Sequence, residues 1–163
     1  MFGARGFWGL QTGPNPTDRA KRGSKRYLIC DGHGVPLAIE LTGANCHDST
    51  QALPLLDAIP PLQGLRGRPR FPPDCVLGDR AYDAQKIRHA LRARHILPLL
   101  AMRNTENGSG LGRWRWVVER TFAWINQFRR LRLRYEKRAD MHLALLTLGC
   151  ILICWRFLQA RSP

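Results

Sequence analysis

The apolar run Met141–Trp155 constrains the fold of this chain more than any other feature. It is about fifteen residues long and includes His142 and Thr147, whereas a helix that spans a membrane needs about 20 apolar residues. We therefore expect a buried helix from about Asp140 to Gln159, apolar on nearly all sides, and no membrane span. The other residues must supply a core that covers this helix.

Two strand-like runs near the start of the chain predict a β-hairpin. Tyr27–Cys30 and Val35–Leu41 are separated by Asp31–Gly34, a cluster of turn-forming residues. Residues 1–24 are rich in Gly, Pro and Arg and have no apolar period. We expect an irregular basic arm there, followed by one domain over residues 25–163.

Strand and helix patterns alternate along the rest of the chain. The expected elements are a helix at 48–59 with Asp48 as its cap, a buried strand at 75–79, a helix at 84–94, a strand at 96–100 and a helix at 113–131. Strands mixed with helices in this order predict an α/β fold, in which helices cover the faces of a sheet.

The charge balance predicts a polyanionic partner. The 163 residues carry 26 Lys and Arg against 12 Asp and Glu, a formal net charge of +14, and 22 of the cations are Arg. Guanidinium groups bind phosphate in a two-point geometry, which favours nucleic acid over an anionic membrane surface, although a GC-rich coding sequence also raises the Arg content. The five cysteines are odd in number and form no Cys-x-x-Cys pair, so we expect an intracellular protein without disulfides or a zinc knuckle.

One basic segment, Arg113–Arg138, is predicted to contact nucleic-acid phosphates. Its nine cations against two carboxylates give a net charge of +7, and they are Arg113, Arg115, Arg120, Arg129, Arg130, Arg132, Arg134, Lys137 and Arg138. Aromatic side chains lie between these cations and could stack on bases. Their helical positions assign all of them except Trp116 and Phe122 to the core.

Two carboxylates stand where they could take part in chemistry. Asp79 ends an apolar strand, where ligands of open α/β sheets gather, and a simple turn residue is the alternative of equal weight. Glu119 projects from its helix opposite the expected core stripe of Trp114, Val117, Val118, Thr121, Ile125 and Phe128. It forms either an exposed ion pair with Arg115 or a lone carboxylate on a phosphate-attracting face. Turn and cap roles explain Asp31, Asp48 and Asp83.

Four segments together resemble a known family. They are TGPNPTDR at 12–19, LTGANCHDS at 41–49, LGDRAYD at 77–83 and WVVERTFAW at 116–124. The combination is similar to the DDE transposases of bacterial insertion sequences, especially the group whose transposase is often encoded by two overlapping frames. The likeness extends over roughly Thr12–Leu158.

The resemblance implies a ribonuclease-H-like fold, a mixed sheet flanked by helices. In this family three carboxylates bind two Mg²⁺ ions and cut DNA, and strand transfer follows. Asp79 matches the second carboxylate and Glu119 the third. Arg115 matches an arginine that helps to hold DNA, one helical turn before the glutamate.

The chain departs from the family pattern in three places. Gly112 and Asn126 occupy the positions of a tyrosine and a lysine of the wider signature, and Arg129 or Arg130 is the candidate for the role of the lysine. Residues 1–11 contain no Asp, so the first catalytic carboxylate and its strand are missing. Asp31 is a poor substitute because the hairpin pattern places it in a turn. The chain therefore looks like the downstream part of a catalytic domain.

Two functions remain open at this point. The chain is either the catalytic-domain part of a DNA transposase, inactive until joined to an upstream-frame portion, or an inactive DNA-binding fragment that inhibits the full transposase. A basic RNA-binding protein would leave Asp79 and Glu119 unexplained. The expected partners are element-end and target DNA, the upstream portion or a second copy, in the cytoplasm at the nucleoid.

Overall fold

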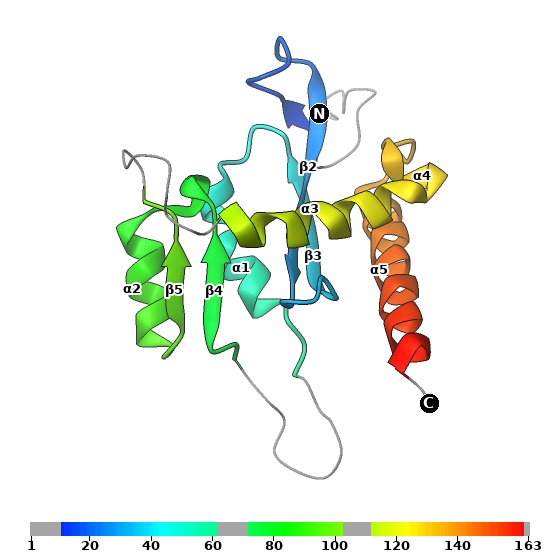
Figure 1. Ribbon diagram of the computed structural model, residues 1–163. Coiled ribbons are helices and arrows are strands. Elements are labelled where there is room, and N and C mark those ends of the chain that lie inside the picture. The colour runs from blue at the N-terminus through cyan, green and yellow to red at the C-terminus, as the bar shows by residue number, and fades with distance from the viewer. Residues whose placement is uncertain (1–10, 62–71, 103–111, 162–163) are drawn as a thin grey trace. The chain divides into compact units, whose positions relative to one another are not determined.

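The computed structural model describes residues 11–61, 72–102 and 112–161 (Figure 1). They form two compact units, and we describe each by itself. Unit 1 joins Met1–Cys46 to Val117–Pro163, and unit 2 is His47–Trp116. The composition of the chain predicts one domain over residues 25–163 and gives no sign of this division.

The sheet of unit 1 contains the predicted hairpin. The strands β1 (Gly13–Pro14), β2 (Arg22–Cys30) and β3 (Pro36–Gly43) pair antiparallel in that order, and Leu28 lies opposite Ile39. The hairpin prediction is therefore confirmed. Strand β2 begins at Arg22 and pairs with β1, so strand structure reaches into the segment expected to be irregular.

Asp31 closes the turn between β2 and β3. Its Oδ1 accepts hydrogen bonds from the backbone N–H groups of His33 at 2.9 Å and Val35 at 2.8 Å. Gly34 adopts a positive φ of 83°, which favours glycine because it has no Cβ. Local chemistry of these few residues fixes the hairpin, and this is the turn role that the sequence predicts for Asp31.

The helix predicted over residues 113–131 is interrupted. Helix α3 (Gly112–Gln127) ends before Phe128, whose extended backbone separates it from α4 (Arg129–Arg132). Phe128 packs against the core of unit 1. Because this residue also fits the apolar stripe of a continuous helix, the helical pattern alone could not show the break.

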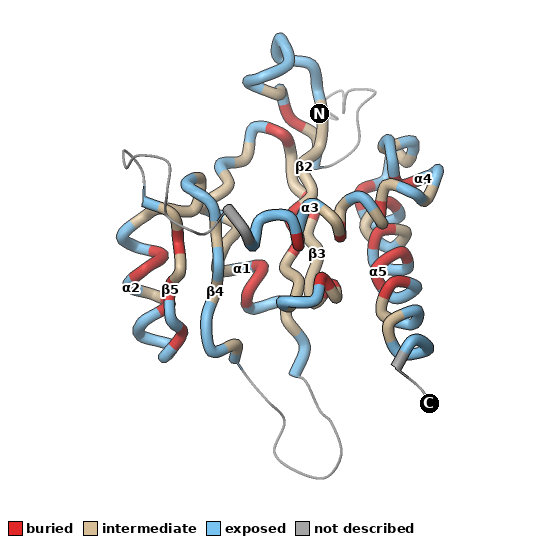
Figure 2. The backbone as a smooth tube through the Cα atoms, viewed as in Figure 1, coloured by how far each residue is buried: buried red, intermediate tan, exposed pale blue. Residues whose placement is uncertain are grey.

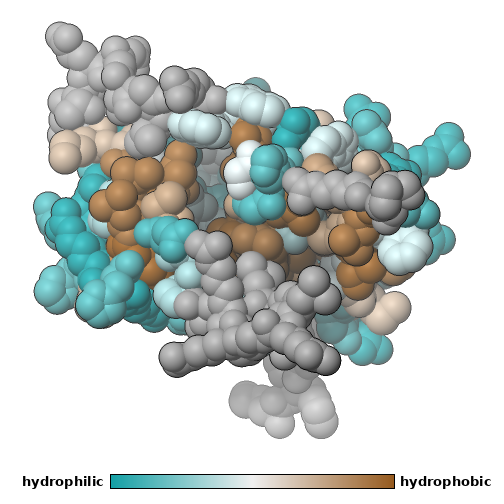
Figure 3. Space-filling model, turned by 60° about the horizontal axis from the view of Figure 1, so that its bottom comes forward, coloured by the Kyte–Doolittle hydropathy of each residue, from teal (hydrophilic) through white to brown (hydrophobic). Residues whose placement is uncertain are grey.

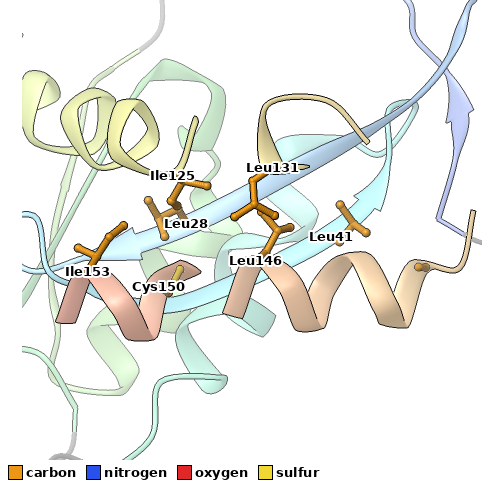
Figure 4. Packing of buried hydrophobic residues seen from close by; sticks show 8 residues of the cluster. Leu28, Leu41, Ile125, Leu131, Leu146, Cys150 and Ile153 are labelled. Carbon is orange, nitrogen blue, oxygen red and sulfur yellow. The ribbon is translucent and has the colours of Figure 1, made fainter. Parts of the chain in front are cut away.

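The core of unit 1 forms around the last helix, α5 (Ala139–Arg161). Figure 4 shows buried side chains of α5 facing those of β2, β3, α3 and α4, with Leu131 and Leu146 pointing toward one another. A Cβ on Gly149 would lie 2.8 Å from Cδ1 of Leu131, so the glycine permits this close approach. The cluster contains Leu28, Leu41, Ile125, Leu131, Ala139, Leu146, Cys150 and Ile153.

The expectation that α5 is buried on nearly all sides is wrong. Figure 2 shows buried and exposed residues alternating along the helix, and Figure 3 shows hydrophobic side chains at the surface where it lies. The exposed ones are Met141, Leu148, Ile151, Leu152, Trp155 and Leu158. A helix that packs against one sheet buries one side, whatever the composition of the other. By length and composition alone Ala139–Ala160 could cross a membrane, but core helices of soluble proteins pass the same test.

Unit 2 contains a βαβ arrangement. Strands β4 (Cys75–Gly78) and β5 (Leu97–Leu100) pair in parallel, and α2 (Gln85–Ala93) connects them and packs on β5. Both strands and the helix appear where the sequence predicts them. Strand β4 is not buried, however, because its residues alternate between exposed and half-buried.

The predicted helix over residues 48–59 is two short helices. The 3₁₀ helix η1 (Asp48–Thr50) precedes α1 (Ala52–Asp57), and the cap of η1 is His47, whose Nδ1 accepts from the N–H of Ser49. The prediction of Asp48 as the cap is therefore wrong by one residue. Together the two units confirm the mixed α/β class of the described residues.

Two leucines of α5 test how much the core of unit 1 contributes to the free energy of unfolding. Leu146 is fully buried and Leu148 is 51% exposed. We expect Leu146→Ala to lower the free energy of unfolding by about 2–5 kcal/mol, because it leaves a cavity. The matched control Leu148→Ala is expected to lower it by less than about 1 kcal/mol. Urea denaturation followed by circular dichroism measures both, and equal losses would contradict this description of α5.

Candidate functional site

Asp79 follows directly after β4, at the carboxyl end of a parallel strand (Figure 1). It is the cap of the 3₁₀ helix η2 (Arg80–Tyr82), and its Oδ1 accepts a 2.9 Å hydrogen bond from the N–H of Ala81. The residue is exposed. The cap bond orients the carboxylate and removes none of its charge, so the turn role and a ligand role are compatible at this position.

A nearly buried ion pair holds the segment after Asp79 in place. Asp83 accepts hydrogen bonds from Nε and a terminal nitrogen of Arg88, at 2.9 and 2.8 Å. Arg88 also donates to the carbonyl oxygen of Leu100 at 2.9 Å, at the end of β5. Asp83 therefore links η2 to α2 and β5. The predicted role of Asp83 as the cap of α2 is wrong, because Ala84 takes that position without a side-chain bond.

Glu119 lies exposed on α3. The opposite, buried side of this helix carries Val117, Thr121 and Ile125. The Oγ1 of Thr121 donates to the carbonyl oxygen of Gly34 at 2.9 Å and so ties α3 to the hairpin turn. The predicted core stripe is confirmed at these three buried positions.

The aromatic side chains divide differently from the prediction. Trp114 is 45% exposed and Tyr135 is 66% exposed, although the sequence pattern assigns both to the core. Phe122 packs against the core, although the pattern places it outside. Trp116 is exposed, as predicted. Val118 of the predicted stripe is also exposed at 36%, since only one narrow side of α3 faces the sheet.

Asp79 belongs to unit 2 and Glu119 to unit 1. In the three described ranges no three His, Cys, Asp or Glu side chains form a ready metal site. Each carboxylate by itself suits a hard divalent cation, because it is exposed and offers oxygen ligands. Asp79 has a second property that suits a divalent cation, because its cap hydrogen bond holds the carboxylate in one orientation.

The predicted DNA-binding arginines fall into two groups. Arg115, Arg129, Arg130 and Arg132 are exposed. Arg120 is engaged within unit 1: it donates to the carbonyl oxygen of His33 at 2.6 Å, and its guanidinium lies 4.8 Å from the centre of the Trp124 ring.

Arg134 is also engaged within unit 1. It donates to the carbonyl oxygens of Glu136 at 2.9 Å and Lys137 at 3.1 Å, and it bonds Ser24 on β2. Burial lowers the pKa of its guanidinium. Arg134 thus fixes the chain between α4 and α5 against the sheet.

Sequence reasoning missed a basic cavity in unit 1. It has a volume of about 480 Å³, and its lining includes Arg22 and Arg26 of β2, Arg132 and Arg134 after α3, and His142 of α5. Two signals were present in the sequence. Arg22 and Arg26 are an even number of residues apart on a strand and so share a face, and His142 is a lone imidazole within an apolar run.

The charges around this cavity act on His142. Burial lowers the pKa of its imidazole, and the positive charges of Arg134 and Arg26 lower it further, while Glu136 opposes them in part. Burial also lowers the pKa of Arg26. His142 is therefore neutral at neutral pH, with one ring nitrogen as donor and the other as acceptor.

Comparison with known proteins decides the family. A family model described as the transposase DDE domain matches residues 4–155. The chain belongs to the DDE transposases of insertion sequences. A Burkholderia cepacia protein assigned as the transposase for insertion sequence element IS402 is 60% identical over 153 residues, which cover 93% of this chain and 72% of the relative. No solved structure matches the chain.

Membership confirms the resemblance carried by the four sequence segments at 12–19, 41–49, 77–83 and 116–124. It also implies a divalent metal, typically Mg²⁺, for the DDE domain. The exposed carboxylates of Asp79 and Glu119 fit such an ion. Their assignment as its ligands comes from matching the family motif and stays a prediction.

The Asp83–Arg88 pair offers a test of what positions Asp79. The side chains of Arg88 and Asp83 are only 9% and 19% exposed, whereas those of Arg94 and Asp57, which pair at 2.6 Å, are 38% and 59% exposed. Asp83→Ala leaves a buried guanidinium without its carboxylate, and we expect a loss of about 2–3 kcal/mol in the free energy of unfolding. The control Asp57→Ala is expected to lose less than about 1 kcal/mol. Thermal unfolding of both variants measures the difference, and similar losses would exclude a special role for Asp83.

Proposed function

We propose that this chain is the catalytic-domain part of a DNA transposase that carries out metal-dependent strand cleavage and strand transfer. One observation carries the proposal: an exposed carboxylate, Asp79, stands oriented at the carboxyl end of a parallel strand, at the position of the second acid of the family motif. We also propose that the strands and helices of both units belong to a ribonuclease-H-like fold, working in the cytoplasm at the nucleoid.

In this proposal Asp79 and Glu119 hold the divalent metal. When bound, a pair of such ions activates water or a 3′-hydroxyl and stabilises the leaving oxygen at phosphorus. The residues of the chain hold the metal and bind the DNA. The two carboxylates supply hard oxygen ligands, and exposed arginines such as Arg115, Arg129 and Arg130 bind DNA phosphates.

We infer that a third carboxylate comes from outside the described residues. Asp31 is the candidate within them, but it lies in the turn between β2 and β3, whereas the first acid of the family motif stands on a strand. We therefore propose that an aspartate of an upstream segment completes the site. Without it the chain by itself is inactive, because the absence of one of three ligands misplaces the metal.

The activity test uses a fusion that joins the chain to an upstream segment carrying a strand with an aspartate. We expect Mg²⁺-dependent cleavage of an element-end duplex by the fusion and none by the chain alone. Asp79→Asn and Glu119→Gln should each lower cleavage at least about a hundredfold, because each removes a charge from the metal site. DNA affinity should change little, since neither substitution removes a cation.

Asp31→Asn is the matched control for this experiment. An asparagine keeps the side-chain oxygen that accepts the two turn hydrogen bonds, so cleavage should persist. If Asp31→Asn abolished cleavage while Asp79→Asn did not, the assignment of the acids would be overturned. A fusion that binds the duplex without cutting it under any metal would favour the DNA-binding fragment instead.

A further inference from the structure

The cavity of unit 1 is a feature that the proposed catalytic residues do not use. It lies between strands β2 and β3, the chain that follows α4, and the first turn of α5, and its volume is about 480 Å³. Ligand sites of proteins measure roughly 300–1,000 Å³. The cavity therefore has room for a phosphate group together with part of a nucleotide.

The lining of this cavity carries positive charge only. Four arginines, Arg22, Arg26, Arg132 and Arg134, line it, and no Asp or Glu is among the described residues that do. Like charges that line one cavity repel one another, and burial deprives Arg26 and Arg134 of some of their bound water. An arrangement of this kind is stabilised when an anion enters.

Arg26 is held rigidly in the wall of the cavity. It donates to the carbonyl oxygen of Leu131 at 2.8 Å and to Oδ1 of Asn126 at 3.0 Å, and its guanidinium lies 6.0 Å from the centre of the Phe122 ring. Both hydrogen-bond partners are neutral. Its positive charge is thus fixed in position and is not matched by a described carboxylate.

Arg22 and Arg132 stand at the opening with their donors available. Both are exposed, and neither side chain makes a hydrogen bond or ion pair with any residue in the described ranges. Each guanidinium presents five N–H donors in a planar fork that fits two oxygens of a phosphate. The exposed ring of Tyr135 also lines the cavity and offers a surface for a sugar or base.

His142 supplies a second, independent sign of a ligand. Only 2% of the residue is exposed, and its Nδ1 is buried without a hydrogen-bond partner among the described residues. A buried polar atom without a partner is unfavourable, so native proteins seldom leave one. An oxygen of a ligand in the cavity would satisfy this nitrogen as an acceptor of its N–H.

We propose that this cavity is a phosphate site that holds one phosphodiester group of the DNA backbone between Arg22, Arg132 and His142. The proposal rests on the proposed function, because it takes DNA as the partner. A phosphodiester suits the site better than a carboxylate, since its oxygens point in several directions and can accept from both rim arginines and the imidazole at once. The site positions DNA and takes no part in cutting it.

The first test measures binding of a fluorescent 20-base-pair duplex to the full chain by anisotropy, over a range of salt concentrations. The double variant Arg22→Gln, Arg132→Gln should bind at least about tenfold more weakly at low salt. The slope of log affinity against log salt should become shallower by about 0.9, the value for one phosphate that the protein no longer neutralises. The control double variant Arg92→Gln, Arg156→Gln removes the same charge from exposed positions outside the cavity. It should leave the slope unchanged, and equal effects of the two variants would overturn the proposal.

The second test follows the imidazole of His142 by NMR while ligand is added to the full chain. The duplex should shift the ring signals to saturation and raise the pKa of the imidazole, because a nearby anion favours its charged form. His142→Phe should weaken binding of the duplex even though Arg22 and Arg132 are unchanged. If inorganic phosphate or a mononucleotide shifts these signals and the duplex does not, the cavity takes a free phosphate compound and the backbone proposal falls.

These outcomes are separate from those of the cleavage test. A fusion that cuts DNA normally while the rim variant binds like its control would refute the cavity site and leave the transposase function intact. A fusion that never cuts, although the rim variant shows the expected drop in affinity and salt slope, would refute the catalytic role and leave the cavity site intact.

Discussion

Apolar packing between α5 and the β2–β3 hairpin is the interaction on which the rest of unit 1 depends. Leu146 and Ile153 of the helix are buried against the strands and against Ile125 of α3. Since α3 carries Glu119 on its outer side, the same packing fixes the direction in which this carboxylate faces solvent. It also brings His142, in the first turn of α5, beside the arginines of β2. Packing of α5 against the β2–β3 hairpin therefore determines the core of unit 1, the direction of the Glu119 side chain and the position of the cavity.

Features fixed by neighbouring residues could be predicted from the sequence. The hairpin depends on Asp31 and Gly34 within a few residues, and Asp79 follows β4 because an apolar run ends there. Helix α2 and strand β5 could be predicted for the same reason, since each has its own period and its own end signals. The family motif added the roles of Asp79 and Glu119, which composition and spacing alone could not supply.

Features that depend on distant contacts could not be predicted. Phe128 fits a continuous helix, but α3 ends at Gln127 and the side chain of Phe128 packs against the core of unit 1. Trp114 and Leu148 have the apolar character of core residues but are 45% and 51% exposed. The cavity needs β2 and α5 to meet across more than a hundred residues of sequence, so no local pattern could show that Arg26 and His142 are neighbours.

The arginines of this basic chain have two different roles. Arg88, Arg120 and Arg134 donate to carbonyl or carboxylate oxygens inside their own units and hold turns and loops in place. Such arginines cannot turn toward a ligand without breaking these hydrogen bonds. Arg22 and Arg132 are exposed and make no such bonds within the described ranges, so they are available to a phosphate. A count of net charge treats these groups alike, whereas the hydrogen bonds separate cations that hold turns and loops in place from cations whose donors are not used within the described ranges.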